Sequence, residues 1–252
     1  MPCPDWLLAR PVAHRGLHDP AHGPLENTLA AADRAARRGF AIEVDLVLSS
    51  DGEAMVFHDG TLDRLTFETG PVGRLMASEL SALPLRGSDQ HIPTLAELLD
   101  VIDDRVPLIA ELKPAWGGRA GGWLAERTAQ ILDGRPDRVA VMSFDPDIVE
   151  ALARFAPDRP RGVTVDERYD GKEYPGLSLM ERFALATLLH LPRTRPDFLA
   201  VGLAALTSPP VRLMKKLRSL PVLAWTVTAA DRARAAAFAD QIIFESFDPD
   251  AG

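Results

Sequence analysis

The sequence contains a single cysteine, Cys3, in 252 residues. One cysteine excludes an internal disulfide and any metal site built from several cysteines, and it is typical of proteins in a reducing compartment. A net positive charge is lacking as well, because 36 acidic residues outnumber 28 basic ones and give a formal net charge of -8. Nucleic-acid binding as the main function is therefore not predicted, since it usually rests on a basic surface.

Long apolar runs are also missing. The stretch from Leu177 to Leu191 is interrupted by Glu181 and Arg182, and it is too short to cross a hydrocarbon core of about 30 Å. The N-terminal residues lack the basic and apolar segments of a signal peptide. We therefore expect a cytoplasmic protein without stable membrane insertion.

The sequence instead alternates short runs rich in Val, Ile and Leu with Ala- and Arg-rich segments of helical period. With 46% hydrophobic residues, the chain can bury a full hydrophobic core without the help of disulfide bonds. No low-complexity linker divides it, so we interpret residues 1–252 as a single domain. Eight strands are predicted, at residues 11–14, 41–48, 107–112, 139–143, 162–165, 197–201, 221–226 and 241–244.

Helix starts lie between these strands. Thr94 and Glu97 have the spacing of a capping box, Asp145 precedes a proline as an N-cap often does, and Thr228 is expected to begin the last helix. Strand and helix repeated eight times predict a single (β/α)8 TIM barrel, with an open doubly wound sheet as the competing arrangement. After the second strand we expect a short extra strand at 54–58 and a small inserted segment at about 59–92, with one helix near 78–83, at one mouth of the barrel.

Acidic side chains share one face of the second strand, because Glu43 and Asp45 are two residues apart. In an antiparallel sheet this face would commonly be solvated. The outer face of a parallel barrel is covered by helices, so the acids must face the interior. The third strand repeats the pattern with Glu111 and Lys113. Since active sites of this fold collect at the C-terminal strand ends, we expect these side chains to meet there.

A positive charge is expected among the three carboxylates. At about 4 Å separation they would repel by roughly 4 kcal/mol per pair at an effective dielectric constant near 20. All-oxygen ligands favour a hard divalent cation, Mg²⁺ or Ca²⁺, with Mn²⁺ as the alternative. Lys113 can supply part of this charge, so a metal-free salt-bridge cluster is the competing interpretation.

Two histidines fall at the same mouth. His14 ends the first strand and precedes Arg15, and His58 follows the extra strand. A lone histidine at a strand end is usually structural, but the shared position with Arg15, Lys113 and the acids favours a catalytic role. The remaining histidines have no comparable charged residues near them in the predicted barrel and are expected in loops or at the surface; they are His18, His22, His91 and His190.

Taken in order, these motifs resemble the glycerophosphodiester phosphodiesterase family. The first set comprises His14-Arg15-Gly16, Glu26-Asn27-Thr28, Glu43 with Asp45, and His58-Asp59 followed by Leu62, Arg64 and Thr66. The second set comprises Glu111 with Lys113 and Trp225-Thr226-Val227. Each element alone is weak, but the ordered series covers nearly the whole chain.

The resemblance implies a barrel enzyme with a small insert that hydrolyses deacylated phospholipids, such as glycerophosphocholine, to glycerol 3-phosphate and an alcohol. Its implied partner is a small glycerophosphodiester substrate. The site residues it implies are His14 and His58 as acid and base, Glu43, Asp45 and Glu111 as ligands of one divalent cation, and Arg15 and Lys113 as contacts of the phosphate oxygens.

Three features depart from the family pattern. The loop before Glu26 is long and carries Leu25 where proline is frequent, Thr228 stands where asparagine is usual, and Glu245 stands where an aspartate is common. These departures bear on the substrate more than on the chemistry.

Several residues are further candidates for lining the substrate pocket. Trp225 lies at the end of the seventh strand and Glu245 follows the eighth, and Phe144, Tyr169 and Tyr174 lie on loops after the fourth and fifth strands. Aromatic residues at these places are also common in packing or at surfaces.

Three rival functions are open. The first is a related phosphodiesterase that releases a cyclic phosphate or acts on lysophospholipids. The second is Schiff-base chemistry at Lys113, which Glu111 disfavours because it should keep the amine protonated. The third is a non-catalytic ligand-binding barrel, which should have lost a histidine or an acid; none is missing.

Overall fold

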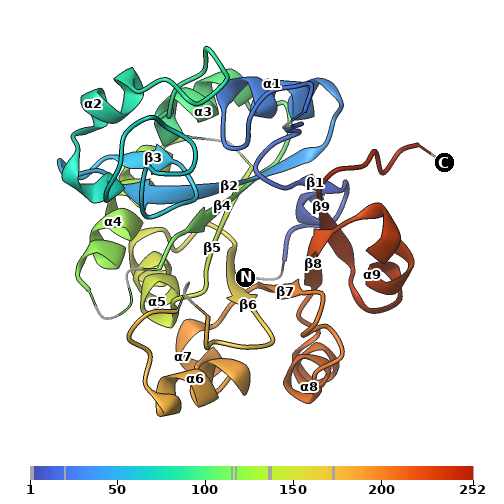
Figure 1. Cartoon of the computed structure of the whole chain (residues 1–252). Helices are drawn as coiled ribbons and strands as arrows, with labels where there is room; N and C mark the ends of the chain where they lie inside the picture. Colours follow the sequence, from blue (N-terminus) through green and yellow to red (C-terminus); the bar gives the residue numbers. More distant parts are fainter. Residues whose placement is uncertain are drawn as a thin grey trace.

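The computed structural model describes residues 3–19, 21–114, 116, 118–135, 138–171 and 174–251. Eight parallel strands form a closed barrel surrounded by helices, which confirms the predicted TIM barrel (Figure 1). Pairing of β1 with both β2 and β9 closes the sheet, which excludes the open doubly wound arrangement. The barrel strands are β1 (Val12–Ala13), β2 (Ala41–Leu48), β4 (Leu108–Leu112), β5 (Val139–Ser143), β6 (Arg161–Val165), β7 (Phe198–Gly202), β8 (Val222–Val227) and β9 (Gln241–Phe244).

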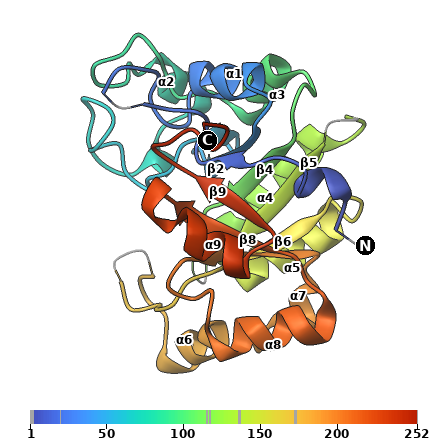
Figure 2. The same cartoon turned by 90° about the vertical axis from the view of Figure 1, so that its right-hand side faces the viewer.

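Helices follow the strands around the outside. Figure 2 shows α6, α7 and α8 on the side of the barrel opposite to α1, α2 and α3. The helices are α1 (Leu29–Arg37), α2 (Ala77–Ala82), α3 (Leu95–Ile102), α4 (Ala120–Leu132), α5 (Pro146–Phe155), α6 (Leu179–Ala186), α7 (Leu191–Thr194), α8 (Pro209–Arg218) and α9 (Arg232–Phe238), with short 3₁₀ helices η1 (Asp5–Leu7), η2 (Val72–Arg74) and η3 (Ala229–Asp231). None of the helices in the described ranges has the length and apolarity that a membrane span requires.

Two of the three predicted helix starts are confirmed. Thr94 caps α3 with the full capping box, and the Asp145 side chain accepts a hydrogen bond at the start of α5. The third differs, because Thr228 precedes the 3₁₀ helix η3 and caps no backbone N–H. Its hydroxyl instead donates to the carboxylate of Asp231 at 2.7 Å, so α9 begins only at Arg232.

Strand side chains alternate between two apolar layers. Ile42, Val44 and Leu46 point outward into a buried cluster shared with α1, α3 and α4, as expected for a strand whose outer face is covered by helices. Phe198 lies in a separate cluster formed by the inward-facing residues. A Cβ at Gly162 would lie 2.3 Å from the Phe198 ring, so only glycine lets this ring fill the interior.

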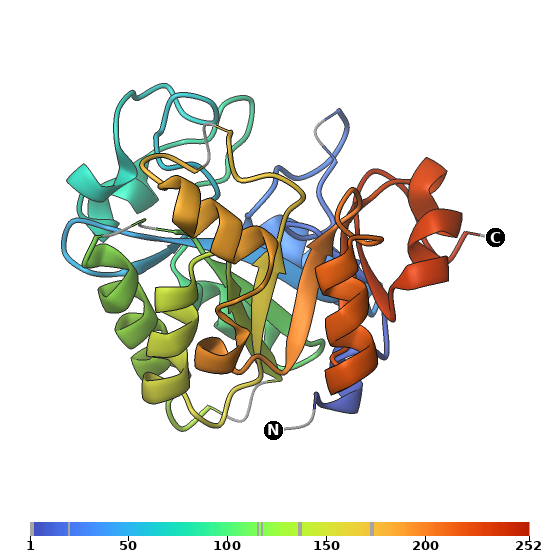
Figure 3. The same ribbon diagram turned by 90° about the horizontal axis from the view of Figure 1, so that it is seen from below.

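The inserted segment lies at the mouth of the barrel where the catalytic candidates gather. The extra strand β3 (Ala54–Val56) pairs antiparallel with β2 and is two residues shorter than predicted. The expected short helix is α2. Apolar residues that include Met55, Leu62 and Leu80 form a buried cluster under the segment. Figure 3 shows the segment on the same side of the barrel as the loop before α1 and opposite to the N-terminus.

His190 lies in the turn before α7, which agrees with the expected loop, but it is buried and not at the surface. His190 directly precedes α7 and is 7% exposed. Both ring nitrogens are buried without a hydrogen-bond partner in the described residues. Burial lowers the pKa of His190 to about 4, so the ring is neutral at physiological pH and serves as a packing residue of the α6–α7 turn.

Candidate active site

Three acids meet at the C-terminal end of the barrel. Asp45 on β2 and Glu111 on β4 are register partners, and Glu43 lies two residues before Asp45 on the same face. Their side chains are almost fully buried, and one carboxylate oxygen from each lies within 4.8 Å of the others. The structure therefore brings together the three acids that the strand pattern predicts to meet.

Two cations pair with part of this cluster. The Lys113 ammonium lies 2.6 Å from Asp45 Oδ1 and 2.7 Å from Glu111 Oε1, and Arg15 Nε lies 3.2 Å from Asp45 Oδ2. Burial raises the pKa of Asp45, but the charges of Lys113 and Arg15 outweigh burial and hold it well below its usual range. Burial lowers the pKa of Lys113, yet Asp45 and Glu111 hold it above its usual range. A protonated Lys113 disfavours Schiff-base chemistry.

Glu43 is the acid left without a cation. Its carboxylate accepts the backbone N–H of Arg15 at 3.0 Å. Among the ion pairs of the described residues, its partner is the ring of His14, with Nε2 4.0 Å away. Burial, Asp45 and Glu111 raise the pKa of Glu43 well above its usual value. Since three buried carboxylates face two cations, the donor set fits a hard divalent ion that would supply the missing charge.

The loop after β1 positions Arg15 by means of unusual backbone angles. Arg15 and Gly16 have φ of 52° and 80°. A Cβ on Gly16 would lie 2.8 Å from Ala31 Cβ, so the His-Arg-Gly run needs glycine in order to approach α1 closely. Asn27, in the same connection, donates to Asp45 Oδ2 at 2.8 Å and accepts from the Asp45 backbone N–H at 3.1 Å. The amide therefore fixes the orientation of the Asp45 carboxylate.

Each candidate histidine is paired with a carboxylate. His14 Nδ1 lies 2.7 Å from Glu245 Oε2, and His58 Nδ1 lies 2.7 Å from Asp59 Oδ1. An ionised carboxylate only accepts hydrogen bonds, so Nδ1 carries the proton in both rings and Nε2 is left for proton exchange. Both histidines line one cavity of about 150 Å³, which the three acids, Arg15, Lys113 and Trp225 also line.

Arg64 ties the inserted segment to the barrel. Its guanidinium donates to Asp59 at 2.7 and 3.1 Å and to Glu26 at 2.7 and 2.9 Å. Arg15 donates to the same Glu26 at 2.8 Å. Because Asp59 in turn holds His58, this network links the insert, the loop before α1 and one candidate catalytic ring. The sequence motifs contain Glu26, Asp59 and Arg64 but indicate no contact between them.

The Glu26 network should appear as acid sensitivity. Burial raises the pKa of Glu26, but Arg64 and Arg15 outweigh burial and lower it from 4.5 to about 2. The folded carboxyl therefore binds its proton less tightly than the unfolded one, so its contribution is present above about pH 4.5 and is lost as the pH falls toward 2. Glu26→Gln should cost about 3 kcal/mol at pH 7 and progressively less toward acid pH.

This prediction is measured by urea unfolding of both proteins across the acid range. The difference between their free energies of unfolding should shrink as the pH falls. A difference that stays constant with pH would show that Glu26 contributes no titrating stability.

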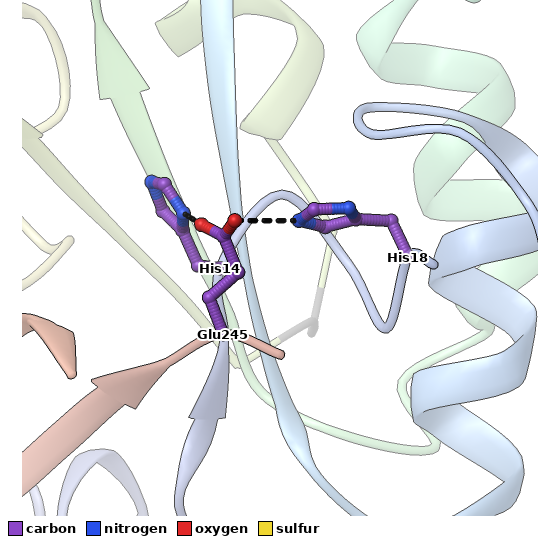
Figure 4. A group of neighbouring side chains, drawn as sticks. All are labelled: His14, His18 and Glu245. Atoms are coloured by element: carbon purple, nitrogen blue, oxygen red, sulfur yellow. Dashed lines mark hydrogen bonds and ion pairs between the residues drawn. The ribbon is translucent and has the colours of Figure 1, made fainter. Parts of the chain in front are cut away.

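The structure corrects the expectation that His18 lies apart from the other candidate site residues. Its side chain is 7% exposed, and Nε2 lies 3.9 Å from Glu245 Oε1, across the carboxylate from His14 (Figure 4). Nothing in its sequence neighbourhood indicates this, because the loop after β1 and the end of β9 are far apart along the chain.

A larger cavity of about 580 Å³ adjoins the site and shares His58, Glu111 and Lys113 with it. Its apolar lining includes Trp116, Phe144 and Tyr174. The Phe144 ring also lies 5.6 Å from the ring of Trp225. The ring of Tyr169 lies 4.9 Å from the ring of Tyr174, and its hydroxyl accepts a hydrogen bond from the backbone N–H of Asp166 at 3.0 Å. Tyr169 therefore packs against a residue of the pocket wall and holds it in place.

The fold and site define an α/β-barrel protein with a buried acidic centre of metal-binding type and two histidine–carboxylate pairs in one cavity. The model of the glycerophosphoryl diester phosphodiesterase family matches residues 14–241. The chain belongs to this family, as the ordered motifs predicted.

Individual proteins are similar to this chain in sequence or in fold. A glycerophosphodiester phosphodiesterase from Caldanaerobacter subterraneus is 38% identical over 37% of this chain and 40% of its own length. The chain thus spans less than half of the first curated relatives it matches. A putative glycerophosphodiester phosphodiesterase from Bacillus subtilis, YhdW, is 27% identical over 76% of this chain and 79% of its own. A phosphodiesterase from Oleispira antarctica, solved with the product sn-glycerol 3-phosphate, has a TM-score of 0.75 at 23% identity, covering 93% of this chain and 92% of its own.

Proposed function

We propose that this protein hydrolyses glycerophosphodiesters to sn-glycerol 3-phosphate and an alcohol with the help of one divalent cation. The observation that carries the proposal is the shared cavity: two histidines, two cations and three acids line it in a chain of this family. The family description and the product named for the Oleispira antarctica structure support the substrate class.

Glu43, Asp45 and Glu111 would hold the cation. Their oxygen-only donor set and the uncompensated Glu43 fit Mg²⁺ or Ca²⁺, with Mn²⁺ as the alternative. When bound, such an ion neutralises charge on phosphoryl oxygens and so supplies Lewis-acid assistance. Lys113 already lies between two of these acids, so a metal-free salt-bridge cluster of the same residues is the competing interpretation.

Arg15 and Lys113 would bind the phosphate oxygens. Both line the cavity, and both have their pKa held above the usual value, since neighbouring carboxylates outweigh the effect of burial. They therefore remain cationic throughout the useful pH range. Fixed positive charge at the phosphoryl group is commonly the largest contribution to such catalysis.

His14 and His58 would manage the two protons of the reaction. One ring takes the proton of the attacking oxygen, which is either water or the substrate's own glycerol hydroxyl, while the other protonates the leaving alkoxide; each transfer is worth about 10² to 10⁴ in rate. Glu245 and Asp59 hold Nδ1 of the two rings. Nε2 is therefore the atom that exchanges protons in each ring.

Cleavage of lysophospholipids is the second candidate function. The cavity of about 580 Å³ with Trp116, Phe144 and Tyr174 in its wall favours it, because an apolar pocket can accept a substrate arm larger than a small alcohol. A diesterase that stops at a cyclic phosphate would use the same residues, and phosphorus NMR of the product separates it from the hydrolase.

The domain organisation and the cellular location also remain predictions. Residues 1–252 are proposed to form one barrel domain with the insert at 59–92, and the cytoplasmic location is predicted from the sequence alone.

A substrate and metal panel tests the proposed function. The chelated protein is incubated with glycerophosphodiesters and lysophospholipids, Mg²⁺, Ca²⁺ or Mn²⁺ is added back singly, and glycerol 3-phosphate and acylated products are measured. Turnover of at least one glycerophosphodiester should return only with metal and should exceed the chelated rate by at least about a hundredfold. Absence of turnover on every substrate with every metal would refute the proposal.

A further inference from the structure

We propose that His14, His18 and Glu245 form a second metal site, suited to Zn²⁺, whose occupation inhibits the enzyme. One nitrogen of each ring and one oxygen of Glu245 lie within 4.8 Å of one another. Figure 4 shows the carboxylate between the two rings, with one oxygen toward each. The two corresponding distances are 2.7 Å to His14 Nδ1 and 3.9 Å to His18 Nε2.

The burial of His18 and its missing hydrogen-bond partner independently indicate a ligand. Its side chain is 7% exposed, and Nε2 is fully covered without a hydrogen-bond partner among the described residues. Most buried ring nitrogens find a partner, because an unsatisfied one forfeits the hydrogen bond that water would make. This nitrogen faces Glu245 at a distance too long for a hydrogen bond, which leaves room for an ion between the ring and the carboxylate.

The donor set separates this site from the acidic cluster. Two imidazoles and one carboxylate are ligands that Zn²⁺ prefers, with bonds of about 2.0–2.2 Å and a fourth position left for water. Glu43, Asp45 and Glu111 offer oxygen alone and suit a hard cation. The charges around Glu245 and His18 also include Glu26 and Arg15, which are paired with each other and largely cancel.

The consequence for catalysis rests on the function proposed for His14. The neutral His14 ring carries its proton on Nδ1, toward Glu245, and keeps the Nε2 lone pair on the side of Glu43. An ion bound at Nδ1 moves this proton to Nε2 with no net release. Nε2 then only donates, so His14 can no longer accept a proton, and turnover stops until a chelator removes the ion.

Binding is tested with Co²⁺ and Zn²⁺ on the full chain in excess Mg²⁺, which keeps the acidic cluster filled. Visible absorption reports four-coordinate Co²⁺, and equilibrium dialysis counts bound Zn²⁺. The wild type should bind one Zn²⁺ per chain, and His18→Gln should weaken its binding at least about tenfold. His22→Gln is the matched control, because His22 is exposed on the same loop, and it should bind Zn²⁺ as the wild type does.

Inhibition is measured in parallel, with each variant compared to its own rate without Zn²⁺. His18→Gln should raise the Zn²⁺ concentration for half-inhibition at least about tenfold, and His22→Gln should leave it unchanged. Equal Zn²⁺ affinity in the wild type and His18→Gln, or Zn²⁺ binding that disappears only in Glu43→Gln, would overturn the site. If no variant turns over substrate, the proposed function fails, and the Co²⁺ and Zn²⁺ binding data alone decide whether the site exists.

Discussion

Replacing His58 by alanine is expected to lower kcat by at least about a hundredfold without unfolding the protein. His58 lines the cavity and is held through Nδ1 by Asp59, so its removal deletes one of the two proposed proton-transfer groups while the barrel strands are untouched. His14→Ala should cause a loss of the same order, since the reaction needs both an acid and a base.

Steady-state kinetics on the substrate found by the panel measures both variants, and circular dichroism checks their fold. His22→Ala is the control, because this exposed histidine lies outside the cavity, and its kcat should match the wild type. Near-normal turnover in either His14→Ala or His58→Ala would refute the acid–base assignment.

Glu43→Gln should abolish metal-dependent activity while sparing the fold. The amide keeps the shape of the side chain and removes the charge that a cation needs, so metal affinity should fall at least about 10- to 100-fold. Titration calorimetry measures this affinity. In a thermal melt, Mg²⁺ at 100 times its Kd should stabilise the wild type by about 2.7 kcal/mol and leave the variant almost unchanged.

The metal-free proteins should differ in their pH dependence. Since burial raises the pKa of Glu43 above its usual value, the folded carboxyl holds its proton more tightly than the unfolded one. The contribution of Glu43 to wild-type stability is therefore present at low pH and is lost as the pH rises above about 4.5. Glu43→Gln should lack this decline and be at least as stable as the wild type at neutral pH.

Asp45→Asn provides the contrasting variant. Asp45 pairs with Lys113 and Arg15 and is held by Asn27, so its replacement removes one carboxylate partner from each of two buried cations. This change should destabilise the metal-free protein by about 3–5 kcal/mol. Equal destabilisation by Glu43→Gln would show that Glu43 is paired after all and would remove the argument for a missing cation.

Much of the barrel could be predicted from local pattern. The observed bounds of the eight barrel strands lie within one residue of the predicted ones, because apolar runs, turns and caps are short-range signals. Strand alternation places Glu43 and Asp45 on one face, and the predicted parallel barrel, whose outer face helices cover, directs that face inward. Asp45 then meets Glu111 because β2 and β4 are adjacent in parallel register.

The contacts between loops could not be predicted in the same way. Arg64 reaches Glu26 across 38 residues, and His14 reaches Glu245 across 231. No alternation or helical period links such positions, since each loop follows its own turns and Gly16 adopts a backbone angle that is set by its approach to Ala31. For the same reason, the proximity of His18 to Glu245 could not be predicted from the sequence.

The sequence by itself determined the barrel, the inward face of the acids and the set of residues from which we propose that a diesterase site is built. Periodicity and strand alternation act over a few residues, and barrel closure brings all strand ends to one mouth. Only the tertiary structure decided which cation each acid pairs with, that Glu43 is left without one, and that Glu245 stands between His14 and His18. These outcomes depend on long-range packing and on the competition between burial and charge, neither of which a local pattern contains.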